Sequence, residues 1–308
     1  MQPEYFVGID AGGTQCRARL TDNQGNVLAN SSTGAANIFS DFRGAIAAAL
    51  SAVENCFNIA ELSAGSRQKT SAAFGFAGAN VTRIRRQALD WPMPFLQRHI
   101  ASDVEIACLG AHAGGPGAVL IVGTGSQGTA YDGQRFHPVG GWGFALSDGG
   151  SGAQLGRSAL RLALRCHEGL SAPSPLTDII MAHFDNSPET MLQWTLSATP
   201  AQWGAFSPCV FEHAARQDSN ALPLVCRLAA DIEQHLSFLV NSSQAKVCLM
   251  GGIAQPVTPY LSPKLQQQLV SPQGDALQGA LLLAAHNQTI VVNSTQRHPY
   301  KKDDRLKL

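Results

Sequence analysis

Residues 5–20 read Y-F-V-G-I-D-A-G-G-T-Q-C-R-A-R-L, and the rest of the chain is organised around this stretch. Residues 5–9 form a short apolar run with β-branched side chains, which predicts a buried strand. Residues 16–20 alternate apolar and charged side chains, the pattern of a half-exposed strand. Asp10, two glycines and Thr14 lie between the two strands. The stretch therefore predicts a β-hairpin whose tip carries a carboxylate, a glycine pair and a hydroxyl group.

The tip of this hairpin is suited to phosphate binding. Glycine has no side chain and permits φ > 0, so the backbone N–H groups of Gly12 and Gly13 can approach a phosphate closely. Asp10 would repel bare phosphate, so the arrangement requires a divalent cation between the two, and Mg²⁺ is the oxygen-seeking ion that accompanies nucleotide phosphates. Taken alone, the loop is equally typical of an ordinary glycine-rich turn after a strand.

Length and composition indicate a globular protein of two domains. The chain has 308 residues, more than one domain usually contains, and 44% of them are hydrophobic. Its formal net charge of zero argues against nucleic acid or an anionic membrane as the main partner, because both favour a basic surface. We expect a cytoplasmic protein, since no signal-peptide pattern precedes the first strand and no stretch approaches the ~18 apolar residues that cross a bilayer.

The cysteine pattern agrees with a reducing environment. Seven cysteines are scattered along the chain, mostly within apolar runs, and no two form a C-x-x-C pair. An odd set of this kind is typical of reduced, buried thiols in the cytoplasm. The same scatter argues against a zinc or iron–sulfur site.

Two further units repeat the strand-then-glycine pattern of the first hairpin. Residues 118–122 form an apolar run that ends in the small-residue turn Gly123, Thr124, Gly125 and Ser126. Residues 247–250 form another apolar run, which the sequence G-G-I-A follows. Glycine at the end of a buried strand lets the backbone approach a ligand closely. The first two units, over 100 residues apart, suggest two halves that face each other across phosphates.

A fourth glycine-rich segment, residues 139–152, reads V-G-G-W-G-F-A-L-S-D-G-G-S-G. Glycine loses much conformational entropy on folding, so such a run is expected only where the backbone must lie close to a ligand. Asp148 is the single charged residue in the segment. It is therefore a candidate ligand-binding residue.

Apolar periodicity predicts the remaining elements. Helices are expected at residues 38–57, 81–89, 104–112, 153–168, 222–240 and 275–285, and a buried strand at residues 70–78. Asn37 precedes the first of these helices, where an N-cap or turn role is the ordinary interpretation. Asp103 precedes the third, where a helix N-cap and a catalytic role are equally open on local sequence. Beyond His286 the chain becomes a polar tail.

The ordered set D-A-G-G-T, G-T-G-S, G-G-W-G-x-x-x-S-D and M-G-G-I-A resembles the N-acetylglucosamine and glucosamine kinases of the actin/hexokinase/heat-shock ATPase superfamily. These kinases are relatives of the ATPases that activate benzoyl-CoA reductase and hydroxyacyl-CoA dehydratase. The resemblance covers residues 5 to about 285 and implies an α/β fold of two ribonuclease-H-like domains around an ATP/sugar cleft. We expect domains at residues 1–105 and 106–274, a final helix at 275–286 packed on the first, and a tail at 287–308.

The resemblance also implies a role for each matching residue. The ATP phosphates would contact Asp10, Gly12, Gly13, Thr14, Gly123, Thr124, Gly125 and Ser126. The adenosine would contact Gly251, Gly252 and Ala254. The sugar would contact Asn37, Asp103, Gly141, Trp142, Gly143 and Asp148. Asp10 would hold Mg²⁺ directly or through water, and Asp103 would be the catalytic base.

The chain departs from the family pattern at two places. Ile253 is bulky at a position that often carries a small residue. Val104 and Glu105 follow Asp103, whereas the family more often has a small residue after its catalytic aspartate. A two-residue slip of the alignment would make Glu105 the base, so both carboxylates remain candidates.

The function implied is an ATP- and Mg²⁺-dependent kinase that phosphorylates the 6-hydroxyl of glucosamine or N-acetylglucosamine. One alternative is an ATPase activator of a CoA-dependent reductase or dehydratase, but no cysteine pattern here matches its bridging iron–sulfur cluster. Another is a sugar-sensing regulator on the same fold, but no helix-turn-helix precedes the first strand. The choice between the two sugars stays open, as does the oligomeric state, for which a homodimer is one alternative.

Overall fold

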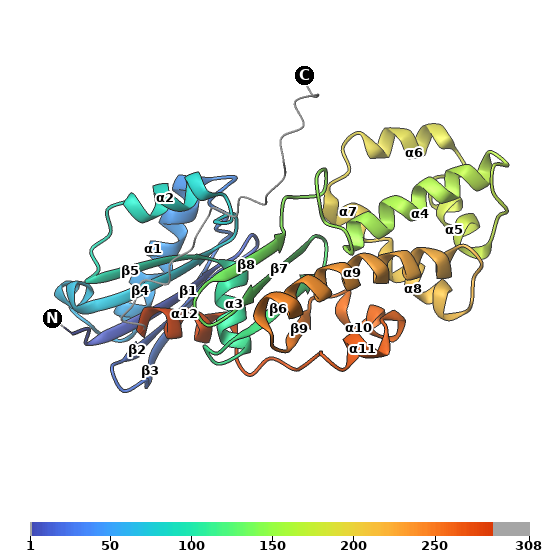
Figure 1. The fold of residues 1–308 in the computed structure, drawn as a ribbon. Helices are drawn as coiled ribbons and strands as arrows, with labels where there is room; N and C mark the ends of the chain where they lie inside the picture. Colours follow the sequence, from blue (N-terminus) through green and yellow to red (C-terminus); the bar gives the residue numbers. More distant parts are fainter. Residues whose placement is uncertain (1, 286–308) are drawn as a thin grey trace, which may run out of the picture.

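The computed structural model describes residues 2–285, which form two β-sheets joined by helices (Figure 1). The first sheet has the order β3-β2-β1-β4-β5. Its strands are β1 (Tyr5–Ala11), β2 (Cys16–Asp22), β3 (Val27–Thr33), β4 (Thr70–Phe76) and β5 (Gln97–Ser102). β1, β2 and β3 form an antiparallel meander, while β4 and β5 run parallel to β1. The hairpin predicted from residues 5–20 is confirmed as β1 and β2.

The second sheet has the order β8-β7-β6-β9 and repeats the first four strands of the first sheet. Its strands are β6 (Gly117–Val122), β7 (Ser126–Tyr131), β8 (Phe136–Gly140) and β9 (Val247–Met250). β6, β7 and β8 are antiparallel neighbours, and β9 runs parallel to β6. In each sheet a glycine turn joins the first two strands, so the two turns predicted from sequence occupy equivalent places in the two halves.

Helices cover both sheets. In the first half these are α1 (Phe42–Ile59), the 3-10 helix η1 (Ala64–Lys69) and α2 (Thr82–Asp90). In the second half they are α4 (Gly152–His167), α5 (Pro175–His183), α6 (Pro188–Thr195), α7 (Pro200–Gly204), α8 (Ser207–Ala215), α9 (Ala221–Ser243), α10 (Ala254–Val257), η2 (Thr258–Tyr260) and α11 (Pro263–Gln266). The helices α4 to α8 gather at the end of the molecule away from the first sheet (Figure 1). Within residues 2–285, no helix has the length and apolar character needed to span a membrane.

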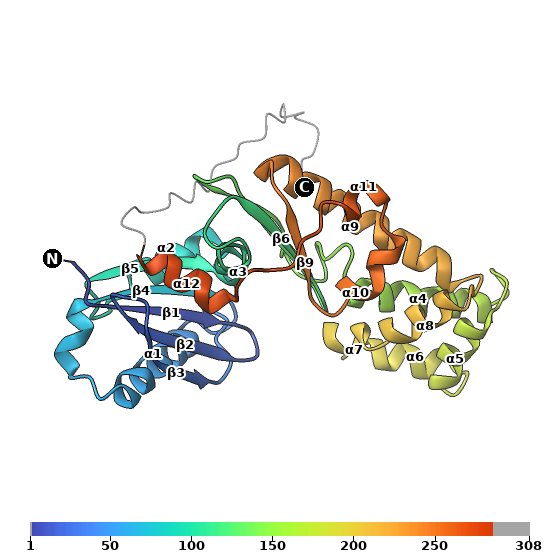
Figure 2. The same ribbon diagram turned by 90° about the horizontal axis from the view of Figure 1, so that it is seen from below.

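Two helices, α3 (Asp103–Ala111) and α12 (Ala276–Ala285), lie side by side between the sheets (Figure 2). They cross closely because Gly110 and Gly279 have no side chains: a Cβ on either would collide with the backbone of the other segment. The predicted final helix thus packs on β1, where the backbone of Leu277 lies over Gly8. The domain boundary expected between residues 105 and 106 falls inside α3, because that helix continues from the first half into the second.

The predicted start of the first long helix was wrong. The helix α1 begins at Phe42 rather than at residue 38, and its N-cap is Asp41, whose carboxylate accepts a hydrogen bond of 3.0 Å from the N–H of Gly44. Residues 97–102, for which no element was predicted, form the edge strand β5. Backbone hydrogen bonds with the neighbouring strand β4, rather than an apolar pattern in residues 97–102, hold this segment as a strand.

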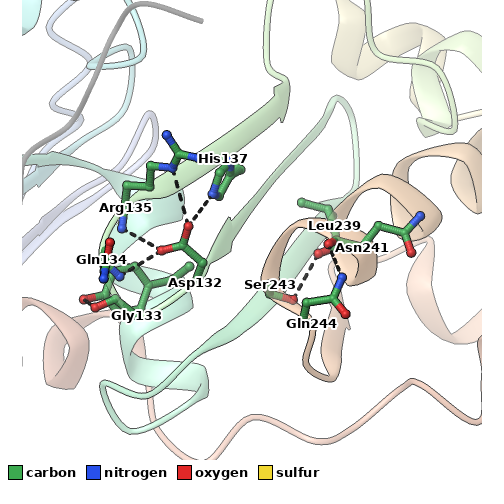
Figure 3. Close-up of polar contacts among 10 residues, drawn as sticks. Asp132, Gly133, Gln134, Arg135, His137, Leu239, Asn241, Ser243 and Gln244 are labelled. Atoms are coloured by element: carbon green, nitrogen blue, oxygen red, sulfur yellow. Dashed lines mark hydrogen bonds and ion pairs between the residues drawn. The ribbon is translucent and has the colours of Figure 1, made fainter.

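The turn between β7 and β8 is organised by one carboxylate (Figure 3). Asp132 Oδ1 accepts hydrogen bonds from the N–H groups of Gln134 (2.8 Å) and Arg135 (2.9 Å), and Asp132 Oδ2 lies 2.7 Å from His137 Nε2. Burial alone would raise the pKa of Asp132, but the hydrogen bonds from His137 and from the two backbone groups outweigh it and lower the pKa to about 2. The Asp132 carboxylate therefore closes the turn and stays ionised.

Candidate active site

Parallel strands bring the candidate catalytic groups to one edge of the first sheet. Ala11 at the end of β1 pairs with Phe76 of β4, and Phe76 pairs with Ser102 of β5. Asp10 therefore lies level with the point where β5 passes into α3, and Asp103 is the first residue of that helix. The carboxyl ends of parallel strands are the usual ligand-binding edge of such a sheet.

The Asp103 carboxyl lies in an environment that favours proton uptake. Burial is the largest cause that raises its pKa, to about 6, and the negative charges of Asp10 and Glu105 raise it further. The N–H of Val104 donates to Asp103 Oδ1 at 2.9 Å and opposes this effect. A carboxylate with a pKa near neutrality at a sheet edge is suited to accept a proton from a substrate hydroxyl.

Glu105, the rival base, is engaged elsewhere. Its Oε2 accepts a hydrogen bond of 2.8 Å from the backbone N–H of Ser102, while Ser102 Oγ accepts one of 3.3 Å from the N–H of Glu105. The Glu105 carboxylate also forms an ion pair with Arg85 and is buried. The N-cap of α3 is thus Ser102, not Asp103, so the cap role considered for Asp103 is wrong. This arrangement favours Asp103 over Glu105 as the group that faces a substrate.

The first glycine turn joins β1 to β2. The N–H of Gly12 donates to the carbonyl of Gln15 at 3.0 Å, and a Cβ built on Gly13 would meet nothing within 4 Å, so one side of the turn is open. Neither Gly12 nor Gly13 has a positive φ, so the turn does not use the left-handed backbone that glycine permits. The two glycines provide open space rather than an unusual conformation. Thr14, the predicted hydroxyl of the turn, is exposed.

The second glycine turn is held against the start of α4. The N–H of Gly123 donates to the carbonyl of Gly125 at 2.9 Å. The N–H groups of Gly152 (2.7 Å) and Ala153 (3.3 Å) donate to the carbonyls of Gly123 and Thr124. This places the N-terminus of a 16-residue helix behind the turn, and the positive end of a helix dipole favours bound anions.

Asp148 lies against the second turn. Its Oδ1 accepts hydrogen bonds from the N–H of Ser126 (3.4 Å) and the hydroxyl of Ser147 (3.3 Å), and its Oδ2 would lie 3.1 Å from a Cβ on Gly125. The residue has a φ of 65° and only 6% of its surface is exposed. Burial raises the pKa of this carboxyl. The structure thus brings a predicted sugar-binding residue together with the predicted phosphate turn.

The loop that carries Gly141, Trp142 and Gly143 meets the first half of the molecule through Asn80. The side-chain amide of Asn80 donates to the carbonyl of Gly141 at 2.9 Å. Gly141 and Gly143 have φ values of 75° and 83°, conformations that glycine adopts without strain, and Trp142 is exposed. Sequence reasoning missed Asn80. An amide directly after the buried strand at residues 70–78 was the available signal.

Asn37 lies beside the residues that follow β4. The N–H of Ile38 donates to the carbonyl of Ala77 at 3.0 Å, which joins this segment to the end of β4. Asn37 Oδ1 accepts hydrogen bonds from the N–H groups of Phe39 (2.9 Å) and Ser40 (3.2 Å). The Asn37 side chain therefore closes a turn, and its oxygen lies against Gly78, where a Cβ would approach it to 2.8 Å.

The predicted adenosine segment follows β9. The N–H of Ile253 donates to the carbonyl of Val122 at 3.0 Å, which places this segment beside the second glycine turn. Gly251 has a φ of 95° and its α-carbon faces the backbone of Val122. A Cβ on Gly252 would meet nothing within 4 Å, so this position is open, and Ala254 begins α10. The bulky Ile253 points into the hydrophobic core of the second half rather than toward a ligand.

The arrangement of acids is compatible with Mg²⁺ brought by a nucleotide. Within residues 2–285, no three His, Cys, Asp or Glu side chains gather as a metal cage. Mg²⁺ is commonly held by one or two carboxylates together with substrate phosphates and water. Asp10, at the base of an open glycine turn, provides one such carboxylate. Its present partner is Arg17, whose Nη2 lies 2.5 Å from Asp10 Oδ2.

The chain is similar in sequence to two curated sugar kinases. Over 280 residues the chain is 37% identical to glucosamine kinase GspK of Vibrio cholerae. The alignment covers 91% of this chain and 95% of that protein. It is 26% identical over 266 residues to an N-acetyl-D-glucosamine kinase of Dictyostelium discoideum, with 81% of this chain and 82% of that protein covered.

Solved structures show the same fold. A Chromobacterium violaceum protein, whose description suggests an N-acetylglucosamine kinase, superposes with a TM-score of 0.78 at 33% identity and covers 92% of this chain and 99% of that chain. A ROK hexokinase of Thermus thermophilus superposes with a TM-score of 0.52 at 18% identity and covers 90% of this chain and 97% of that one. The expected α/β architecture of two actin-like ATPase halves is thereby confirmed. Residues 7–284 match a family of ATPases throughout, and the chain belongs to the BadF/BadG/BcrA/BcrD ATPase family.

Proposed function

We propose that this protein is an ATP-dependent amino-sugar kinase that transfers the γ-phosphoryl group of Mg-ATP to the 6-hydroxyl of glucosamine or N-acetylglucosamine. The observation that carries this proposal is the placement of Asp103 beside Asp10 at one sheet edge, while Glu105 is engaged in a cap and an ion pair. The two relatives reported above, which align with this chain over 95% and 82% of their own lengths, are named as kinases of these two sugars.

Each part of the site has a task in phosphoryl transfer. This reaction needs positioning and charge neutralisation more than covalent help. The backbone N–H groups of the two glycine turns that are not used within the turns would contact the phosphates. Asp10 would hold Mg²⁺, which would supply charge neutralisation at the phosphoryl oxygens. Asp103 orients the acceptor hydroxyl and accepts its proton as the phosphoryl group is transferred.

The sugar would bind between the two halves, where Asn80 meets Gly141. Asn37 and Asp148 supply an amide and a carboxylate. Such groups discriminate strongly between sugars, because a sugar that lacks the matching hydroxyl would leave the buried amide or carboxylate without a hydrogen-bond partner.

The five buried cysteines lie within the hydrophobic parts of the fold, and no disulfide joins any of the seven. This agrees with a cytoplasmic enzyme rather than one that carries a cluster on paired cysteines.

A coupled assay of ADP release tests the proposed function. We expect turnover that depends on Mg²⁺ and on glucosamine or N-acetylglucosamine, with glucose and N-acetylmannosamine as comparison sugars. Phosphorus NMR of the product identifies the phosphorylated hydroxyl. ATP hydrolysis that no sugar accelerates would contradict the proposal.

The pH dependence of the reaction reports on Asp103. Because burial and nearby charge raise the pKa of Asp103 to about 6, its basic form predominates above that pH and is lost below it. We expect kcat/KM to be constant above about pH 7 and to fall roughly tenfold per pH unit well below pH 6. Circular dichroism at each pH provides the control for unfolding. A profile that stays flat down to pH 4.5 would show that no such group must be ionised.

Substitution of Asp148 tests sugar recognition. Asp148→Ala removes charge-assisted hydrogen bonds and should weaken sugar binding by about 2–4 kcal/mol, while nucleotide affinity changes little. Calorimetric titration with each ligand measures the two affinities separately. Asp148 also touches the backbone of the second turn, so an equal loss of both affinities would mean that its role is to shape that turn.

A further inference from the structure

The only substantially buried ion pair among residues 2–285 lies directly behind Asp103. Arg85 of α2 donates from Nη1 to Glu105 Oε1 at 3.2 Å and from Nη2 to Oε2, a two-point contact. The side chains of Arg85 and Glu105 are 15% and 6% exposed. The other ion pairs in this part of the chain have at least one partner that is more than a quarter exposed.

Glu105 connects this ion pair to the backbone that carries Asp103. The same carboxylate accepts the N–H of Ser102, and its own N–H donates to the Ser102 hydroxyl, so it closes a capping box around the first turn of α3. Asp103 is the first residue of this turn and directly follows the cap residue Ser102. Any displacement of Glu105 therefore moves the backbone at both sides of Asp103.

Helix α2, which carries Arg85, also reaches the opposite side of the site. It begins at Thr82, two residues after Asn80, whose amide donates to the carbonyl of Gly141 in the glycine-rich loop. One short segment, residues 80–85, thus contacts the loop of the second half at one end and the helix of the candidate base at the other.

We propose that Arg85 is a positioning residue for phosphoryl transfer: by holding Glu105 in the capping box, it fixes the direction in which the Asp103 carboxylate points. The proposal rests on the kinase function given above. A bidentate guanidinium–carboxylate contact has a defined geometry, which a lysine ammonium cannot reproduce. Without Arg85 the buried carboxylate of Glu105 has no counter-ion, and it must leave the cap to reach water.

Four variants separate positioning from simple stabilisation. Arg85→Met leaves Glu105 unpaired, and Glu105→Gln keeps a side chain that still closes the capping box. The double variant removes the uncompensated charge and retains the cap. Arg86→Met, an exposed arginine on the same helix, is the matched control.

We expect Arg85→Met to lower kcat about 10- to 100-fold, with KM for ATP and sugar changed less than about threefold, because small displacements of a reacting group have effects of this size. Glu105→Gln and Arg86→Met should keep most of the rate. The double variant should recover the kcat of Glu105→Gln. Hydrogen exchange at the amides of Val104 and Glu105 should be faster in Arg85→Met and slow again in the double variant.

Two results would overturn the inference. One is an Arg85→Met enzyme whose kcat, corrected for the folded fraction, stays within twofold of the original. The other is a double variant no better than Arg85→Met in rate and in exchange. If Arg85→Met does not fold, Arg85→Lys takes its place, and its kcat and amide exchange are compared with those of the double variant. The exchange measurement needs no turnover, so it tests the positioning role even if the unmodified protein fails to phosphorylate sugars, a result that would refute the proposed function alone.

Discussion

Asp103→Asn is expected to lower kcat by about 10²–10⁴-fold while ATP and sugar still bind. The amide has nearly the same size as the carboxylate and can still accept the hydrogen bond from the N–H of Val104, so the first turn of α3 should be retained. What is lost is the ability to accept the proton of the 6-hydroxyl. Steady-state kinetics measure the rate, and calorimetry measures the two affinities.

Glu105→Gln is the matched control for Asp103→Asn, because it makes the same chemical change two residues along the same helix. Its side chain faces Ser102 and Arg85, so most of the rate should remain. The reverse outcome would transfer the catalytic role to Glu105. A modest effect of both substitutions would mean that neither residue is the base and that the stretch only begins a helix.

Asp10→Asn should cut turnover by roughly 10³-fold, several kcal/mol of activation free energy, and leave the fold intact. Asp10 lies at the end of β1, and its ion pair is with Arg17, whose side chain is 43% exposed, so loss of this pair has a small effect on stability. The large effect comes from the loss of the charged oxygen that would hold Mg²⁺ against the phosphates. Kinetics as a function of Mg²⁺ concentration measure it.

Asp22→Asn provides the control for this substitution, since Asp22 is a carboxylate at the other end of the same hairpin, where it closes the turn before Asn26. It should leave the rate and its Mg²⁺ dependence unchanged. Near-normal activity of Asp10→Asn at saturating Mg²⁺ would exclude the proposed metal role.

Local sequence was sufficient to predict the framework of the site. Apolar runs that end in glycine predicted β1, β6 and β9, because strand periodicity and the absence of a side chain are properties of a few consecutive residues. The same reasoning identified Asp148 as the one charge in its loop. It failed for β5 and for the start of α1, where pairing with β4 and a competing cap at Asp41 decided the outcome.

Tertiary structure decided which of the two carboxylates is held in an ion pair. The resemblance favoured Asp103 as the base and left Glu105 as its rival. In the folded structure Arg85, on another helix, pairs with Glu105, while the charge of Asp10, on another strand, acts on Asp103. Asn80 likewise gains a role only where it meets Gly141. Sequence alone determined where the backbone turns and which residues could act. The residues that contact these side chains lie far away along the chain. Only the folded structure therefore shows which candidate side chains are already engaged.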